Sequence, residues 1–299
     1  MRASTAMTRG IAYAALAYMA WGLFPLYFRQ LSGVDAFEIV LHRVAWSLVF
    51  LVALLLWLRR WSWLAPLRHR PLVLGAACIS ALLLSCNWLV YVWAVLHGRV
   101  VDASLGYFIN PLVNVLLGFF VLHERPRAAQ WAAVALAAAG VLWIAALGPQ
   151  VPWVGLVIAV SFGLYGLMRK TAALGAIEGL TLETLLLAPL AVAVLGWWTW
   201  QGRGGLAHHD GATLAWLIGV GPLTAVPLLL FAAGARRIPL ATLGLLQYVS
   251  PSLQLLLGVW LFGESLAGNR LLGFVLIWIA LALYSVESWR HARAPRGAV

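Results

Sequence analysis

Three ionisable residues, Glu38, His42 and Arg43, lie within a few positions of one another in a long apolar stretch of the sequence. On a helix Glu38 and His42 share a face because they are four residues apart, whereas Arg43 projects about 100° away from His42. Charged groups inside hydrocarbon are costly, and they normally face a cavity or one another. The trio therefore indicates substrate binding or a proton relay that opens to the periplasmic side. The alternative is a structural clamp in which Arg43 reaches the membrane interface or pairs with Glu38.

A further acid, Glu183, occupies a similar position near the start of a later apolar run. The residues that follow it at the spacings of His42 and Arg43 are apolar, Leu187 and Ala188, so the two polar sets differ. Glu183 is either the acid of an inner gate or a first-turn residue that the helix dipole favours.

The segment NWLVYVWA (87–94) places polar and aromatic side chains at helical intervals. Asn87 and Tyr91 are about one turn apart, with Trp88 beside them, which predicts a polar and aromatic stripe. Aromatic walls that carry a few amides suit an amphiphilic or aromatic ligand. The alternative is that these rings belong to the belts of Trp and Tyr at the membrane interfaces, which the 17 tryptophans supply readily.

Two prolines, Pro111 and Pro251, lie inside apolar runs that resemble each other. Proline frees a carbonyl four residues back, and a freed carbonyl in a membrane is tolerated where it lines a cavity or meets a polar neighbour. We therefore predict paired hinges with a polar lining. The alternative is interhelical hydrogen bonding with close packing at glycines. The predicted lining residues are Tyr107, Asn110, Asn114, Gln247, Tyr248 and Gln254, and the glycines are Gly106, Gly118, Gly244 and Gly258.

The elements that position these residues are predicted to be membrane-spanning helices. The 299 residues are 64% hydrophobic and 10% charged, with a mean hydropathy of +0.93. A soluble domain is about 45–50% apolar and about 25% charged, so the soluble and disordered classes are excluded. A spanning helix needs about 20 apolar residues. We predict an all-α integral membrane protein whose ten transmembrane helices lie at residues 11–28, 36–58, 72–96, 103–122, 129–147, 153–168, 180–200, 212–234, 239–262 and 271–286.

The 20 lysines and arginines are distributed unevenly between alternate loops. With ten spans, 15 of them fall on the side that holds both termini, four fall on the other side, and Arg43 lies within a span. Positive residues are enriched in cytoplasmic loops, so both termini are predicted to be cytoplasmic. Basic residues scattered among apolar runs do not indicate nucleic-acid binding.

Five of the predicted spans are repeated in the other five. Residues 103–124 resemble residues 241–264, and WGLFPLYFR (21–29) resembles FGLYGLMRK (162–170). Because five is odd, the second copy enters the membrane from the opposite side, as in secondary transporters whose substrate site lies near the midplane between the halves. The predicted units are a cytoplasmic N-terminus (1–10), a first repeat (11–147), a second repeat (148–287) and a basic cytoplasmic C-terminal tail (288–299).

Several kinds of catalytic or cofactor site have no counterpart in the sequence. A phosphate-binding loop needs a GxxxxGK[ST] motif, and the single lysine, Lys170, follows Arg169 instead. The seven histidines form no pair of the HExxH kind. His208, His209 and Asp210 form a weak metal-like cluster, which we expect to be solvated in a loop. We predict no catalytic residue, no metal and no cofactor.

Long segments of the sequence resemble the EamA branch of the drug/metabolite transporter superfamily. The resemblance covers about residues 10–288 and includes WGLFPLYF (21–28), EIVLHRVAWS (38–47), NWLVYVWAV (87–95), ASLGYFINPLVNVLLG (103–118) and LTLETLLLAP (180–189). It implies ten helices in two inverted EamA repeats, residence in the bacterial inner membrane and a permease role. It does not identify the transported compound.

Together these features predict a secondary transporter that moves a small metabolite or drug-like amphiphile by alternating access, without ATP hydrolysis. The five-helix halves would rock around a central cavity lined by the third, fourth, eighth and ninth spans. The expected partners are the substrate, membrane lipid and a coupling proton carried by Glu38 or His42. Two alternatives stay open: a membrane-embedded enzyme acting on a lipid, and a non-transporting regulator of the same fold. The oligomeric state is not determined.

Overall fold

The computed structural model describes residues 2–146, 153–204, 206, 209–261 and 268–293, and within these residues the chain is helical without a β-strand. The helices are α1 (Arg2–Gly22), α2 (Phe24–Phe28), α3 (Ala36–Leu58), α4 (Pro71–Leu96), α5 (Val100–Phe120), α6 (Ala128–Ala146), α7 (Trp153–Thr171), α8 (Ala176–Gln201), α9 (Gly211–Ala235), α10 (Leu240–Leu246), α11 (Val249–Leu261) and α12 (Gly268–Arg293). Two short 3-10 helices, η1 (Arg29–Leu31) and η2 (Ala65–His69), lie in the links.

Each of the ten predicted apolar runs carries helix, which confirms the all-α membrane fold. Among the described residues nine helical stretches are long and apolar enough to cross a membrane, and α12 adds a shorter apolar stretch at Leu271–Ala280. The predicted tails are partly helical, because α1 begins at Arg2 and α12 continues to Arg293. The predicted boundary between repeats, at 147–148, lies outside the described residues, as do residues 294–299.

Two of the long helices, α3 and α9, begin at aspartate caps. Asp35 precedes α3, and its carboxylate accepts hydrogen bonds from the backbone N–H groups of Phe37 and Glu38. Asp210 precedes α9 in the same way and accepts from the N–H of Thr213 at 2.8 Å. Hydrogen bonds from Thr213 lower the pKa of Asp210, because they favour its ionised form. These caps satisfy amides that the first helical turn leaves free.

The two predicted hinges differ in the structure. The helix α5 continues through Pro111, whereas the ninth span is interrupted at Gln247 and Tyr248, between α10 and α11. Pro251 has no N–H to bond with the Gln247 carbonyl, and the N–H of Ser250 bonds with that carbonyl instead, at 3.0 Å. The break in the ninth span therefore lies where Pro251 lacks an N–H donor. No such break occurs at Pro111 in α5.

Close helix contacts hold the centre of the bundle together. An ideal Cβ on Gly106 of α5 would lie 2.7 Å from the carbonyl oxygen of Gly155 on α7, so only glycine fits there. A Cβ added to Gly244 of α10 would similarly lie 3.1 Å from the Cα of Pro111 on α5. The predicted close packing at these two glycines is confirmed.

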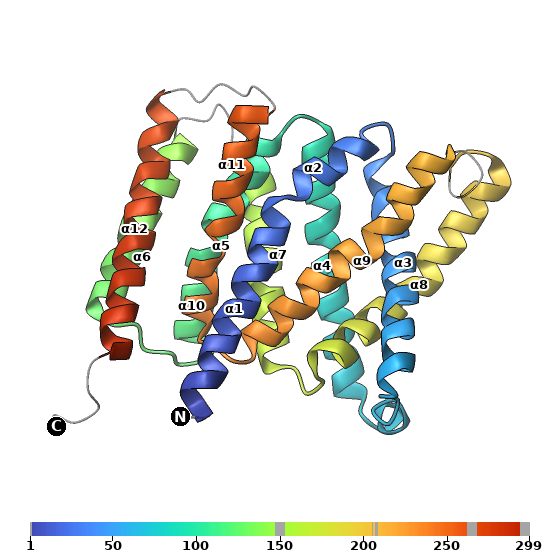
Figure 1. The fold of residues 1–299 in the computed structure, drawn as a ribbon, viewed down its shortest axis with the longest axis horizontal. Coiled ribbons are helices and arrows are strands. Elements are labelled where there is room, and N and C mark those ends of the chain that lie inside the picture. The colour runs from blue at the N-terminus through green and yellow to red at the C-terminus, as the bar shows by residue number, and fades with distance from the viewer. Residues whose placement is uncertain (1, 147–152, 205, 207–208, 262–267, 294–299) are drawn as a thin grey trace.

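The arrangement of the helices separates a central group from a lateral pair (Figure 1). The helices α1 and α9 pack against each other on the near face, α3 packs against α8 and α9, and α7 packs between α4 and α5. The helices α6 and α12 pack against each other at one edge of the molecule. The start of α1 and the end of α12 lie at the same, lower edge of the view, as an even number of spans requires.

Candidate functional site

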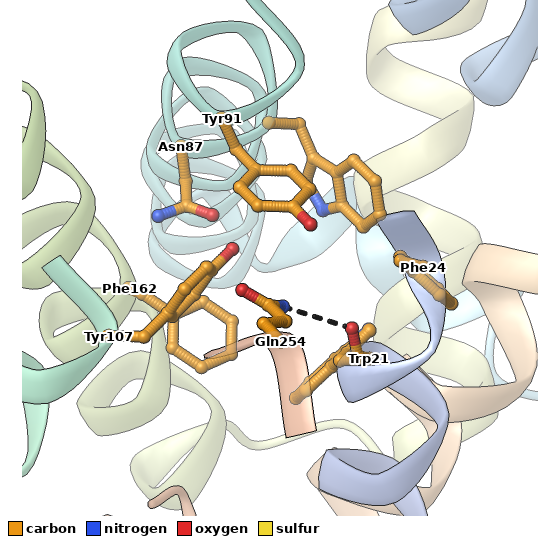
Figure 2. A pocket seen from close by; sticks show the side chains of 8 residues that line it. Trp21, Phe24, Asn87, Tyr91, Tyr107, Phe162 and Gln254 are labelled. Carbon is orange, nitrogen blue, oxygen red and sulfur yellow. Dashed lines mark hydrogen bonds between the residues drawn. The ribbon is translucent and has the colours of Figure 1, made fainter. Parts of the chain in front are cut away.

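A small cavity lies where the two halves of the chain meet, and Figure 2 shows the side chains around it. Its volume is about 20 Å³, which is room for a water molecule but not for a metabolite. The lining comes from α1, α2, α4, α5, α7 and α11, and consists of Trp21, Phe24, Asn87, Trp88, Tyr91, Tyr107, Phe162 and Gln254. The third, fourth and ninth spans line the cavity as predicted, but the eighth does not. The first and sixth spans line it instead.

The cavity is bounded by polar atoms that have no protein partner within the described residues. The amide nitrogen of Gln254 donates to the carbonyl oxygen of Trp21 at 3.1 Å, which fixes this amide in the centre of the view (Figure 2). The other amide atom, Oε1 of Gln254, is buried and unpaired, as are the Trp21 indole nitrogen and the Tyr91 hydroxyl. Unpaired buried polar groups are costly, so these three atoms are suited to a bound ligand or water.

Aromatic rings pack edge to face around these polar atoms. Trp21 and Phe162 lie at equivalent positions of the paired segments 21–29 and 162–170, and their ring centroids are 5.4 Å apart. The ring centroids of Tyr91 and Tyr107 are 5.5 Å apart, and Tyr107 also packs edge to face on Phe162. Such pairs have well-defined geometry. The site is an aromatic box with a few amides and hydroxyls.

Five of the predicted residues line this box: Asn87, Trp88, Tyr91, Tyr107 and Gln254. Asn87 is also anchored across the halves, because its amide donates to the Ile158 carbonyl at 3.0 Å and to Ser161 at 3.1 Å. The remaining predicted residues lie elsewhere.

The interhelical alternative describes Asn110 and Asn114 better than the cavity prediction does. Asn110 donates its amide to the Ala159 carbonyl on α7, and Asn114 donates to Asn110 Oδ1 at 2.9 Å. Asn110 therefore links α5 to α7, and Asn114 bonds to Asn110 from within α5. Gln247 and Tyr248 are also buried away from the cavity, and Tyr248 stacks on Phe108 at 6.0 Å.

Glu38 forms a polar contact at one end of the bundle. Its Oε1 lies 2.9 Å from His209 Nε2 and 3.8 Å from His42 Nε2. The Trp46 indole N–H donates to His42 Nδ1 at 3.2 Å, which holds the imidazole toward Glu38. The expectation that His209 is solvated is wrong, because this loop residue packs onto Glu38 with 15% of its side chain exposed. His208 lies outside the described residues.

Arg43 lies deeper in the bundle than Glu38 and does not pair with it. The side chain is buried, and its guanidinium carbon lies 5.1 Å from the centre of the Trp88 ring. Neither the predicted snorkelling nor the predicted pairing with Glu38 is therefore observed.

Glu183 belongs to a buried ion pair near the opposite end. Its Oε1 lies 3.2 Å from Nη1 of Arg169 and accepts from the Ser80 hydroxyl at 2.7 Å. The Tyr165 hydroxyl approaches the other carboxylate oxygen at 3.5 Å. Glu183 is thus more than a first-turn residue, and Arg169, which was counted among the loop cations, has only 2% of its side chain exposed.

The sequence analysis missed Trp21, Phe24 and Phe162 in the cavity wall and the partners Arg169 and His209. The first three belong to the paired segments 21–29 and 162–170, so the repeat was the signal that could have identified them. His209 is brought to Glu38 by a loop, and loop paths leave no periodic pattern in sequence.

Known proteins resemble the chain over nearly its whole length. The model of the EamA-like transporter family matches residues 8–146. An uncharacterized transporter of Pseudomonas aeruginosa is 46% identical over 294 residues, which cover 97% of this chain and 98% of that protein. The protein RarD of Streptomyces exfoliatus is 42% identical, covering 99% of this chain and 94% of its own, and that of Escherichia coli is 40% identical, covering 94% and 95%. A crystal structure with 20% sequence identity shares the fold, with a TM-score of 0.69 over 93% of this chain and 97% of its own.

Proposed function

This chain belongs to the EamA-like transporter family, and we propose that it is a secondary permease that moves a small metabolite or drug-like amphiphile by alternating access. No ATP is hydrolysed, so a gradient drives any uphill movement. The observation that carries the proposal is the central cavity, in which Trp21, Tyr91 and Gln254 present buried polar atoms without protein partners. A substrate that satisfies these atoms would recover the cost of burying them.

The two proposed halves, 11–147 and 148–287, are inverted repeats that rock about this cavity. The edge-to-face contact of Trp21 with Phe162, equivalent residues of the two halves, supports this arrangement. The contact of Glu38 with His209 closes the bundle at one end, and the ion pair of Arg169 with Glu183 closes it at the other. In this proposal, the two contacts open in turn to admit and release the substrate.

We place the protein in the bacterial inner membrane with both termini in the cytoplasm. The asymmetry of the loop cations supports this orientation, since removing the buried Arg169 from the count leaves fourteen cations against four. The Glu38 end is then periplasmic and the Glu183 end cytoplasmic. Cysteines introduced at exposed residues near the two ends, Gln30 and Thr171, report the orientation through their reaction with a membrane-impermeant maleimide in intact cells.

Replacement of Gln254 by Leu is expected to lower transport at least about fivefold while the protein remains folded. The change keeps the volume of the side chain approximately but removes the amide that faces the cavity and bonds to Trp21. Loss of a buried polar contact to substrate costs about 1–3 kcal/mol, which corresponds to about 5-fold to 150-fold. The measurement is untargeted metabolite profiling of cells and medium with and without the protein, followed by uptake of the identified compounds into reconstituted vesicles.

The matched control is Gln201→Leu, which changes an exposed glutamine at the end of α8. This variant should transport like the wild type at equal abundance in the membrane. If Gln254→Leu changes the metabolite profile as strongly as the wild-type protein does, the cavity is not the substrate site. If no compound differs in amount between cells with and without the protein, the transport proposal is contradicted.

We further propose that a proton is coupled to transport through Glu38 and His42. Nε2 of His42 lies 3.8 Å from the Glu38 carboxylate, and His209 contacts the same carboxylate, so the cluster can hold or release a proton. In vesicles with an imposed pH gradient, the double variant Glu38→Ala with His42→Ala is expected to transport only down the substrate gradient. Accumulation that still follows the pH gradient in this variant would exclude both residues as the coupling groups.

A further inference from the structure

Among the buried charged side chains of the described residues, Arg43 differs from the others because it has no ion-pair partner. Among the side chains that the structure describes, four Asp, Glu or Arg residues are buried, namely Glu38, Arg43, Arg169 and Glu183. Glu183 pairs with Arg169, and Glu38 contacts His209 and His42. Arg43 has no hydrogen bond or ion pair to any described residue, and its Nε is buried without a partner. A buried guanidinium without an anion is costly, so its retention requires a reason.

The cavity and Arg43 share one wall. Trp88 lines the cavity, and the Arg43 guanidinium lies over the ring of the same residue, 5.1 Å from its centre. The contact with the ring compensates the charge only partly, because a cation over an aromatic face gains about 2 kcal/mol when it is desolvated. Glu183 acts on Arg43 through its electric field but is held in its own ion pair with Arg169. The guanidinium therefore lies beside the site with its hydrogen-bonding capacity unused.

The remaining walls restrict what an anion bound at Arg43 can look like. They are mainly aromatic, with the amides of Asn87 and Gln254 and the hydroxyls of Tyr91 and Tyr107. Guanidinium binds carboxylates through two parallel hydrogen bonds, and flat apolar groups pack well on aromatic faces. A single cation matches a single negative charge, whereas a phosphate monoester carries about −1.5 to −2.

We propose that Arg43 binds the carboxylate of the substrate, and that the substrate is a small monocarboxylate with a flat, apolar body lying against Trp88 and Phe162. This inference rests on the proposed transport function and specifies its substrate class. Trp88 separates the cation from the cavity in this structure. The proposal requires this ring to turn, so that the guanidinium and the cavity join into one site.

The first test compares benzoate with its neutral isostere benzamide on the purified wild-type protein in detergent. Ligands that bind the folded state raise the temperature of unfolding, and titration of this rise gives an apparent Kd. At matched ionic strength benzoate is expected to bind at least tenfold more tightly than benzamide, and sodium chloride or sodium phosphate alone is expected to produce no saturable rise. Equal binding of benzoate and benzamide, or an equal rise with the inorganic anions, overturns the proposal.

The second test assigns the anion site to Arg43. Arg43→Gln is expected to abolish the preference for benzoate over benzamide, and Arg43→Lys is expected to retain part of it. The matched control is Arg99→Gln, since Arg99 lies 5.8 Å from the centre of the Trp93 ring and 5.7 Å from that of Trp153 but does not border the cavity. A full preference in Arg43→Gln overturns the assignment.

If Arg43→Gln does not fold, Arg43→Lys and the wild-type comparison still decide the result. A preference in Arg43→Lys as strong as in the wild type counts against a two-point guanidinium contact and overturns the assignment. The outcome is separable from that of the transport proposal. If the metabolite profiles depend on Gln254 but benzoate and benzamide bind equally, the transport proposal stands and the proposal of a carboxylate substrate is rejected.

Discussion

Replacement of Arg169 by Met is expected to lower the free energy of unfolding by about 3–5 kcal/mol, which is the usual cost of removing one partner of a buried ion pair. The guanidinium bonds to Glu183 at 3.2 Å and donates to the carbonyl oxygen of Gly175 at 3.0 Å. Without it the buried carboxylate keeps only the hydroxyls of Ser80 and Tyr165. The measurement is unfolding in mixed micelles with increasing sodium dodecyl sulfate, followed by circular dichroism.

The neighbouring residue provides the control for this prediction. Lys170→Met removes a less deeply buried cation whose Nζ lies 3.5 Å from Glu124 and donates to the Ile238 carbonyl at 2.7 Å, and it should cost less than Arg169→Met. The double variant Arg169→Met with Glu183→Met should be more stable than Arg169→Met alone, because no unpaired carboxylate is left. Equal stability of Arg169→Met and Lys170→Met would mean that the ion pair does not stabilise the bundle.

Replacement of Gly106 by Ala is expected to destabilise the bundle by about 1–3 kcal/mol, although alanine is the better helix former. Its Cβ would lie 2.7 Å from the Gly155 carbonyl oxygen and 2.9 Å from the Gly155 Cα, so α5 and α7 would have to separate. Backbone atoms cannot turn aside as a flexible side chain can. The separation would also stretch the bond from Asn110 to the Ala159 carbonyl and displace Tyr107 in the cavity wall.

At a second glycine, Gly196, replacement by alanine is expected to change the free energy of unfolding in the opposite direction. Gly196 lies inside α8, and a Cβ added there meets no atom within 4 Å. Gly196→Ala is therefore expected to stabilise the protein by about 0.5–1 kcal/mol through helix propensity alone. Should both alanine variants change stability in the same direction, the close packing of α5 on α7 would not be the cause.

Local patterns predicted the helices and part of the cavity. The spacing of Asn87, Trp88 and Tyr91 fixes one face of α4, and that face lines the cavity. The same reasoning misplaced Asn110 and Asn114, because a polar stripe on a helix serves a neighbouring helix as well as a cavity, and only the packing of α5 on α7 decides between them.

Contacts that depend on long-range geometry were not predictable in this way. Arg169 reads as an ordinary loop cation because it follows an apolar run beside Lys170, and its burial results from the position of Glu183 on the next helix. Pro251 and Pro111 have the same chemistry, yet only the ninth span is interrupted. Proline removes one hydrogen bond in either helix, and the surrounding helices determine whether the backbone separates.

The lateral pair of helices, α6 and α12, has a separate consequence. They meet closely, since a Cβ on Gly140 would lie 2.7 Å from the Gly273 carbonyl oxygen, and neither helix lines the cavity. Their outward side chains, such as Leu142, Ile279 and Leu283, are exposed and apolar, so they meet acyl chains. Substitutions on these outer faces would adapt the protein to bilayers of different thickness while leaving cargo recognition unchanged.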